Sequence, residues 1–176
     1  MTEGVRCGLL RILGAMLLLA PGALVGGAAA EVGPTSGLQV PRFVSLKADK
    51  VNVRAGPSRE NEVSWVFTRA GLPVEITAEF ENWRRIRDSE GAEGWVYHSL
   101  LSGRRTALIA PWSKNETFAL RERPESNATV SARLQPGVLG TLKACNRHWC
   151  RIFGDGFDGY LEQDRLWGVY PGEAIE

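Results

Sequence analysis

One segment carries the clearest structural pattern in this chain: Ala48-Asp49-Lys50-Val51-Asn52-Val53-Arg54-Ala55-Gly56-Pro57-Ser58. Its two valines alternate with Asn52 and Arg54, which is the two-residue period of a strand with one buried face. The Gly-Pro pair that follows is typical of a tight turn. We therefore predict a short strand over 51–54 that runs directly into a turn.

A second, weaker copy of this segment is found at Phe118-Ala119-Leu120-Arg121-Glu122-Arg123-Pro124-Glu125. The correspondence continues towards the C-terminus, where Trp83 matches Trp149 and Gly94-Trp95-Val96 matches Gly159-Tyr160-Leu161. Apolar, glycine and proline positions agree while most surface positions differ, as expected for two copies of one fold. We predict two similar β-units, over residues 42–103 and 107–170.

Composition and turn spacing favour an all-β fold. The chain has 176 residues with 20 Gly and 9 Pro, and its short apolar runs are separated by turn residues. Such spacing is typical of small barrels or sandwiches. The linker at 103–106 is short, so we expect the two units to pack against each other. The apolar tail at 166–171 is expected to fill their interface.

The first thirty residues have the pattern of a signal peptide. Arg6 and Arg11 precede an apolar run at 12–20, and Ala28-Ala29-Ala30 offers small residues of the kind that signal peptidase recognises. Pro21-Gly22 interrupts the apolar run, which is too short for a bilayer span of about 20 residues. We expect cleavage after Ala30, with an uncleaved anchor as the alternative. The mature protein would then be periplasmic or secreted and without a membrane span.

Residues 31–41 lack periodicity and are expected to form a flexible lead-in. Cleavage after residue 30 would leave equal numbers of basic and acidic residues, because it removes two arginines and one glutamate. A neutral chain gives no reason to expect nucleic acid as a partner.

Cleavage would also remove Cys7 and leave the pair Cys145 and Cys150. An even pair in an exported protein indicates a disulfide. The repeat places both cysteines on the arms of one hairpin, where facing Cα atoms lie about 4.5 to 5.5 Å apart. A metal site would need more ligands than His98 and His148 can add, and a hairpin tip gives a Cys-His nucleophile little shelter. We predict a disulfide, no metal and no cofactor.

The segment 51–58, followed by Trp83 and by Gly94-Trp95-Val96, resembles the bacterial SH3-type domain. The chain from residue 42 to 172 is similar to tandem pairs of such domains in exported proteins of Gram-negative bacteria, especially alphaproteobacteria. The second copy departs from the motif, with Arg123 at the turn glycine and Tyr160-Leu161 in place of Trp-Val. The resemblance implies two tandem SH3-like small β-barrels, each of about five to seven strands. It also implies a binding role towards cell-wall peptides or proteins and supplies no catalytic residues.

Five residues are candidates for ligand binding: Arg54, Trp65, Trp95, Tyr97 and Trp112. Aromatic side chains can line a peptide groove, although most of them in a small barrel belong to the core. Trp65 and Trp112 have no aromatic counterpart in the other copy, which favours a groove or an interface.

Other candidate positions recur in both copies. Arg54 recurs as Arg121, which favours a structural link between strand and loop over a clamp for a ligand carboxylate. The matching Trp83 and Trp149 are expected in the core.

The sequence contains no Gly-rich phosphate loop, Ser-His-Asp set or metal signature, so we do not expect an enzyme. We expect an exported, non-catalytic binding module for a cell-envelope ligand, either a peptidoglycan peptide or an envelope protein. The alternative is a structural or assembly subunit of an envelope complex with no small ligand. An open aromatic groove would favour the module, and a flat apolar patch would favour the subunit.

Overall fold

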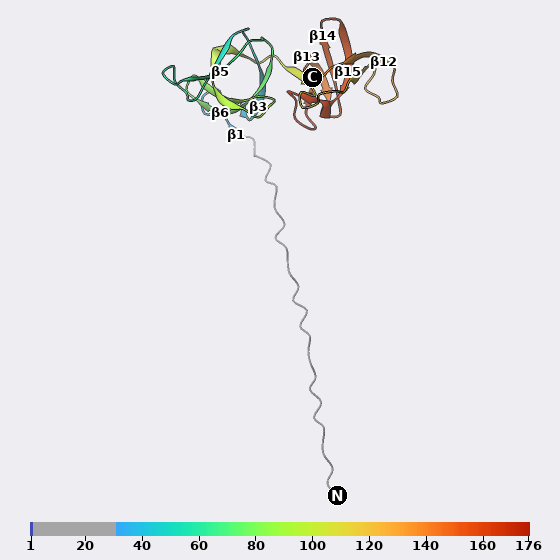
Figure 1. Ribbon diagram of the computed structural model, residues 1–176, viewed down its shortest axis with the longest axis horizontal. Coiled ribbons are helices and arrows are strands. Elements are labelled where there is room, and N and C mark those ends of the chain that lie inside the picture. Colours follow the sequence, from blue (N-terminus) through green and yellow to red (C-terminus); the bar gives the residue numbers. More distant parts are fainter. Residues whose placement is uncertain (2–30) are drawn as a thin grey trace.

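The computed structural model describes Met1 and residues 31–176, so most of the predicted signal peptide lies outside the described residues. Two curled antiparallel sheets lie side by side, the first blue to green and the second yellow to red (Figure 1). Within the described part of the chain, no helix has the length and apolar character needed to cross a membrane. The predicted all-β fold of two tandem units is confirmed.

The first sheet has seven strands in the order β5-β4-β8-β7-β6-β3-β9. Its elements are β3 (Arg42–Leu46), β4 (Val51–Arg54), β5 (Val63–Phe67), β6 (Pro73–Phe80), β7 (Trp83–Arg87), β8 (Glu93–Tyr97), the 3-10 turn η1 (His98–Leu100) and β9 (Leu101–Ser102). The strand predicted over 51–54 is β4, and its two valines are fully buried in the core of this unit.

The second sheet repeats the first. Its elements are β10 (Thr106–Ile109), β11 (Phe118–Arg121), β12 (Val130–Leu134), β13 (Leu139–Asn146), β14 (Trp149–Gly154), β15 (Phe157–Glu162), the 3-10 turn η2 (Gln163–Arg165), β16 (Leu166–Trp167) and β17 (Ala174–Ile175). The order β12-β11-β15-β14-β13-β10-β16 matches that of the first sheet strand for strand, and β17 adds to β13.

Even the irregularities of the two sheets correspond. The register shifts between Val53 and Arg54 in β4, and between Leu120 and Arg121 in the matching β11. A second shift follows Ile76 in β6 and Leu142 in β13. Because a bulge bends a strand and increases its twist, shared bulges give both sheets the same curl. The repeat seen in the sequence is therefore a repeat of structure.

The segment before β3 is ordered, contrary to the expectation of a flexible lead-in over 31–41. Strands β1 (Glu31–Val32) and β2 (Gln39–Val40) form a hairpin. The side chain of Glu79 in β6 holds this hairpin by accepting hydrogen bonds from the Ser36 hydroxyl at 2.6 Å and the Ser36 amide at 2.9 Å. A distant buried carboxylate orders a segment that has too little periodicity to be recognised locally.

The C-terminal tail fills the junction between the units, which confirms the expectation for residues 166–171. The Phe43 ring of the first unit contacts Trp167 at 5.1 Å and Tyr170 at 4.7 Å between ring centroids. The Trp167 indole donates to the Pro73 carbonyl at 3.2 Å, and the Tyr170 hydroxyl donates to Glu75 at 2.8 Å. The two units are thus joined by apolar and polar contacts.

The predicted disulfide is confirmed. Cys145 in β13 and Cys150 in β14 are directly opposite in the register, with Cα atoms 4.1 Å apart, and their sulfur atoms are bonded. Both cysteines are buried within the core of the second unit. The bond closes the hairpin between β13 and β14 and holds its tip beside the junction of the units.

Candidate functional site

The structure distributes the five predicted site residues over three places. Arg54 and Tyr97 line one groove on the first unit. Trp112 lines a larger groove between the units. Trp65 and Trp95 line neither of these two grooves. The sequence grouped these residues as candidates for ligand binding, and the structure assigns three of them to two separate grooves.

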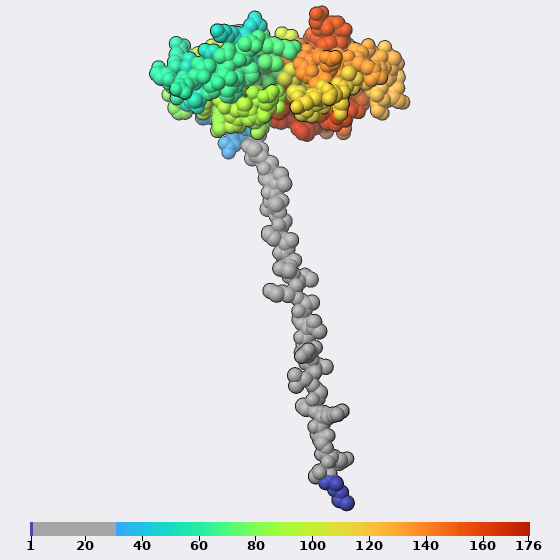
Figure 2. Space-filling view, viewed as in Figure 1, coloured from blue at the N-terminus to red at the C-terminus, as the bar shows by residue number. Residues whose placement is uncertain are grey.

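The larger groove, which we call the interdomain groove, has a volume of about 810 Å³. Residues of both units line it, at the junction where the units abut in Figure 2. Its aromatic lining is Phe43, Trp112, Trp149, Trp167 and Tyr170. Trp112, in the loop after β10, is 55% exposed. Ligand sites often occupy such boundaries between domains because two surfaces can there enclose one ligand.

One rim of the interdomain groove is the tip of the β13–β14 hairpin. This tip presents Arg147, His148 and Trp149 to the groove. The Asn146 side-chain oxygen accepts hydrogen bonds from the amides of His148 at 3.2 Å and Trp149 at 2.8 Å. The Cys145–Cys150 disulfide closes the base of the same tip. The rim is therefore held in one shape by covalent and hydrogen-bonded constraints.

A buried polar network supports the floor of this groove. Glu75 is 3% exposed and accepts hydrogen bonds from Arg87 Nε and from the Tyr170 hydroxyl, each at 2.8 Å. Burial, together with the hydrogen bond to Glu75, raises the pKa of the Tyr170 hydroxyl. The phenol therefore stays protonated and serves as a fixed donor between the units.

Glu173, just after the tail, accepts hydrogen bonds from Arg105 and from the Tyr170 amide. Burial alone would raise the pKa of this carboxyl group, but hydrogen bonds from Arg105 and from the Tyr170 amide outweigh burial and lower the pKa. Arg105 approaches the carboxylate at 2.6 Å and also donates to the Gly168 carbonyl at 2.8 Å. The linker arginine thus anchors the tail that forms part of the interdomain groove.

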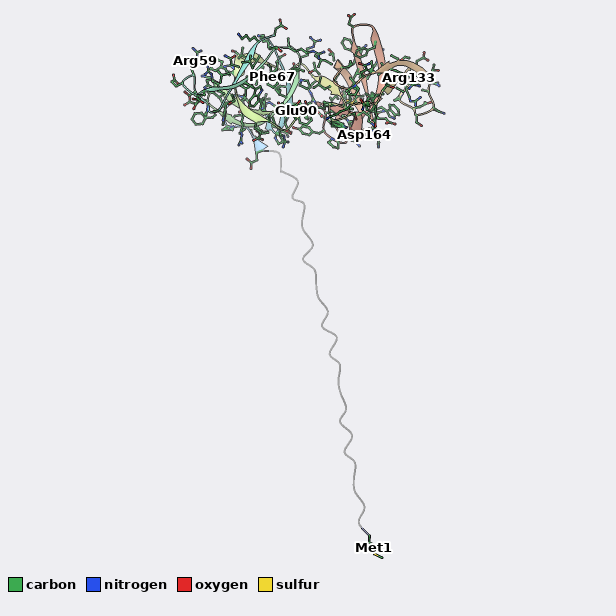
Figure 3. All side chains as sticks on the ribbon, viewed as in Figure 1. Met1, Arg59, Phe67, Glu90, Arg133 and Asp164 are labelled. Atoms are coloured by element: carbon green, nitrogen blue, oxygen red, sulfur yellow. A yellow bond between two sulfur atoms is a disulfide. The ribbon has the colours of Figure 1, made fainter. Side chains whose placement is uncertain are left out.

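The smaller groove, which we call the first-unit groove, has a volume of about 430 Å³. It is lined by Asn52, Arg54, Arg59, Trp83, Tyr97, Ser99 and Leu100. The Trp83 and Tyr97 rings meet edge to face at 5.4 Å, and the Arg59 guanidinium lies 5.6 Å from the centre of the Tyr97 ring. Figure 3 labels Arg59 at the end of the molecule remote from the second unit.

Arg54 has a structural role that the second unit repeats. Its Nη1 donates to the Asn61 carbonyl at 2.6 Å, and Arg121 Nη1 donates to the Ala128 carbonyl at 2.7 Å. Asn61 and Ala128 occupy corresponding positions in the repeat. These bonds support the link between strand and loop; a ligand-binding role for Arg54 stays a prediction.

The two remaining tryptophan candidates serve the first sheet. Trp65 is half-buried and packs against the core of the first unit and against Phe67. Trp95 pairs with Arg54 and Arg85 in neighbouring strands and is half-buried. Neither placement brings these side chains to a groove described above, and their binding role stays a prediction.

The sequence predicted that Trp83 and Trp149 would each lie in the core of their own unit, but only Trp83 is buried. Trp83 is 8% exposed, whereas Trp149 is half-buried and lines the interdomain groove. Trp167 and Tyr170 also line that groove and were expected only as interface residues. The available signal for these two residues was their aromatic character within the apolar run at 166–171. Among the described residues, no cluster of three or more His, Cys, Asp or Glu side chains is placed to hold a metal ion.

Comparison with known families gives two matches in this chain. The family described as "Bacterial SH3 domain" matches residues 47–103 and again residues 114–168. A search of curated proteins finds no match.

Two solved structures show a weak likeness. NlpC2 from Trichomonas vaginalis is 15% identical, with 74% of this chain and 49% of that chain covered and a TM-score of 0.35. NlpC1 from Trichomonas vaginalis is 15% identical, with 77% and 48% covered and a TM-score of 0.34. The present chain therefore spans about half the length of each of these proteins.

Proposed function

This chain belongs to the bacterial SH3 domain family, and on that premise we propose that it is an exported, non-catalytic binding module for a peptide of the cell envelope. The peptide is presented either by peptidoglycan or by an envelope protein. The observation that carries this proposal is the open, aromatic interdomain groove. A volume of about 810 Å³ suits a ligand of several residues.

The lining of the interdomain groove suits a peptide. Its tryptophan and tyrosine rings offer apolar surface together with donor groups, a combination enriched at recognition sites. Glu162 and His148 add groups able to pair with the amides of an extended chain. Because the disulfide and the tail hold the walls, little conformational entropy is lost when a ligand binds.

The residues at the groove also support a non-catalytic role. The two cysteines near His148 are joined in a disulfide, so neither provides a thiolate nucleophile. Glu75 is engaged by Arg87 and Tyr170. Recognition without chemistry accounts for this lining.

Export is part of the proposal. The signal-like pattern of residues 1–30 and the disulfide both favour an oxidising compartment such as the periplasm, because disulfides persist there and are rare in the cytosol. We expect the mature protein to begin at Glu31.

A sedimentation assay with purified sacculi tests the proposal. The full-length gene is expressed in a Gram-negative host, and the periplasmic protein, checked by mass for a start at Glu31, is mixed with sacculi. We expect retention at moderate salt and about tenfold weaker binding for Trp112→Ala, because the indole is a large exposed part of the groove.

Phe80→Ala is the matched control, since Phe80 is a similarly exposed aromatic residue, at 51%, outside the interdomain groove. Equal loss in both variants would contradict the groove as the site. Failure of the wild-type protein to bind sacculi, together with capture of a peptide-bearing envelope protein that Trp112→Ala loses, would assign the ligand to that protein. Binding to neither would favour the alternative of an assembly subunit.

A further inference from the structure

The first-unit groove differs in charge from its counterpart in the second unit. The charged residues that line it are Arg54 and Arg59, with no aspartate or glutamate among its described lining residues. Its other lining groups are aromatic, aliphatic or neutral polar side chains. The groove therefore combines two guanidinium groups with an aromatic surface.

Both arginines are available to an additional anion. Neither is part of an ion pair among the residues that the structure describes. Arg59 is exposed, and Arg54 uses Nη1 to hold the Asn61 carbonyl. The neighbouring carboxylate of Glu60 accepts a hydrogen bond from the Ser58 hydroxyl and is also attracted by the charges of Arg54 and Arg59, but it does not line the groove and forms no direct ion pair with either arginine.

The corresponding groove of the second unit is lined by residues of both charges. Its groove is smaller, about 270 Å³, and is lined by Glu116, Thr117, Phe118, Ala119, Arg121, Trp149, Leu161, Glu162 and Arg165. Glu162 stands at the position of Tyr97, and Arg165 at that of Leu100. Arg165 approaches Glu162 at 3.7 Å and lies 5.8 Å from the centre of the Phe118 ring.

The repeat thus provides an internal comparison. Where the second unit has two glutamates beside its arginines, the first unit has aromatic rings and two arginines, with no carboxylate among the described residues that line its groove. The position of Arg59 is occupied by Ser126 in the second unit, where Arg165 supplies the second cation from another position. Two cations in a groove whose described lining residues include no carboxylate favour an anionic ligand.

We propose that the first-unit groove is a second binding site, for an acidic peptide, with a carboxylate at Arg54 and Arg59 and an apolar side chain against Tyr97 and Trp83. A planar guanidinium pairs with a carboxylate through parallel hydrogen bonds, and the aromatic surface holds the adjoining part of the peptide. This site is independent of the interdomain groove and of the ligand proposed there. The carboxylate comes from an acidic side chain or from a chain end.

Amide NMR titration of the mature two-unit protein tests this inference. The probes are acetyl-Ala-Glu-Leu-Glu-Ala-amide, the same peptide with Gln for Glu, and that Gln peptide with a free carboxyl end. We expect the Glu peptide to bind at least tenfold more tightly than the blocked Gln peptide, with shifts at Arg59 and Tyr97. Tighter binding of the free-ended Gln peptide than of its blocked form would assign the carboxylate to a chain end.

Variants separate the site from general charge effects. Arg59→Gln should weaken binding of the Glu peptide about tenfold, and Tyr97→Glu, which copies the second unit, should abolish it. Arg133→Gln is the matched control, because Arg133 is exposed in the second unit, well away from Arg59 in Figure 3, and should bind as the wild type does. An unchanged spectrum elsewhere shows that each variant is folded.

Three results would overturn the inference. They are equal affinity for the Glu peptide and both Gln peptides, shifts confined to Trp112 and the interdomain groove, and equal shifts of Arg59 with inorganic phosphate alone. The proposed function is tested separately by Trp112→Ala, so the failure of one proposal leaves the other in place.

Discussion

Glu79 shows how one side chain can order a segment far from it in the sequence. Its carboxylate is inaccessible to solvent and meets Arg42 at 2.8 Å and Arg84 at 3.3 Å. The hairpin before β3 adds bonds from Ser36 and from the Thr35 amide. Burial alone would raise the pKa of Glu79, but these hydrogen bonds and the charge of Arg84 outweigh burial and lower the pKa from 4.5 to about 2.

Substitution of this carboxylate should destabilise the first unit. We expect Glu79→Gln to lower the free energy of unfolding by about 3 kcal/mol, because two arginines lose their buried counter-charge. The wild-type contribution is present above pH 4.5 and is lost as the pH falls towards about 2, since the folded pKa is the lower one. Urea unfolding between pH 7 and pH 2.5 measures both effects. The difference between wild type and variant should shrink with falling pH, and a constant difference would contradict this role.

At the scale of elements, each unit has a glycine at a corresponding position, Gly94 in β8 and Gly159 in β15, where that strand lies against its neighbour. A Cβ atom on Gly94 in β8 would lie 2.5 Å from Val53 Cγ1, and one on Gly159 in β15 would lie 2.7 Å from the Arg121 carbonyl. The close approach of β8 to β4, and of β15 to β11, excludes any side chain there. This accounts for the glycine shared by the two copies of the motif.

Gly94→Ala should therefore destabilise the protein by about 2 kcal/mol through overpacking against β4. Gly103→Ala is the control, because its Cβ would meet no atom within 4 Å. Urea denaturation of both variants, followed by tryptophan fluorescence, measures the difference. Equal stabilities of the two variants would show that β4 and β8 can separate without cost.

At the scale of the whole molecule, the tail crosses the junction of the two units and connects them. Phe43, Glu75 and Pro73 of the first unit contact Trp167 or Tyr170 of the tail. The Thr106 hydroxyl at the start of β10 also donates to the Gly71 carbonyl at 2.7 Å. The interdomain groove exists only while these contacts hold.

Removal of one hydroxyl tests this coupling. Tyr170→Phe should lower the free energy of unfolding by about 1.5 kcal/mol, because Glu75 loses a buried donor. Tyr97→Phe is the control, since the Tyr97 hydroxyl has no hydrogen-bond partner among the described residues. Because the folded pKa of Tyr170 is raised, the stability of the wild type should also fall as the pH rises above 10, and that of Tyr170→Phe should fall less. A loss of equal size in both variants would contradict the coupling.

Much of this architecture was predictable from residues close together in the chain. Alternation over 51–54, turn residues at 56–57 and the repeated glycines identified the strands and their duplication, because strand period and turn chemistry are local properties. The disulfide followed from the two cysteines that remain when residues 1–30 are set aside, and from the hairpin that the repeat implied. The tail at 166–171 indicated an interface because a contiguous group of apolar side chains seldom stays exposed without a partner.

The sequence by itself thus determined the two-unit β-fold, the disulfide and the coupling of the units. Only the tertiary structure decided that Trp112 and Trp149 line one groove while Arg54, Arg59 and Tyr97 line another. It also decided that Glu79 orders the N-terminal hairpin. The physical reason is that a groove or a buried carboxylate cluster depends on which side chains meet across distant strands, and a local pattern carries no information about those meetings.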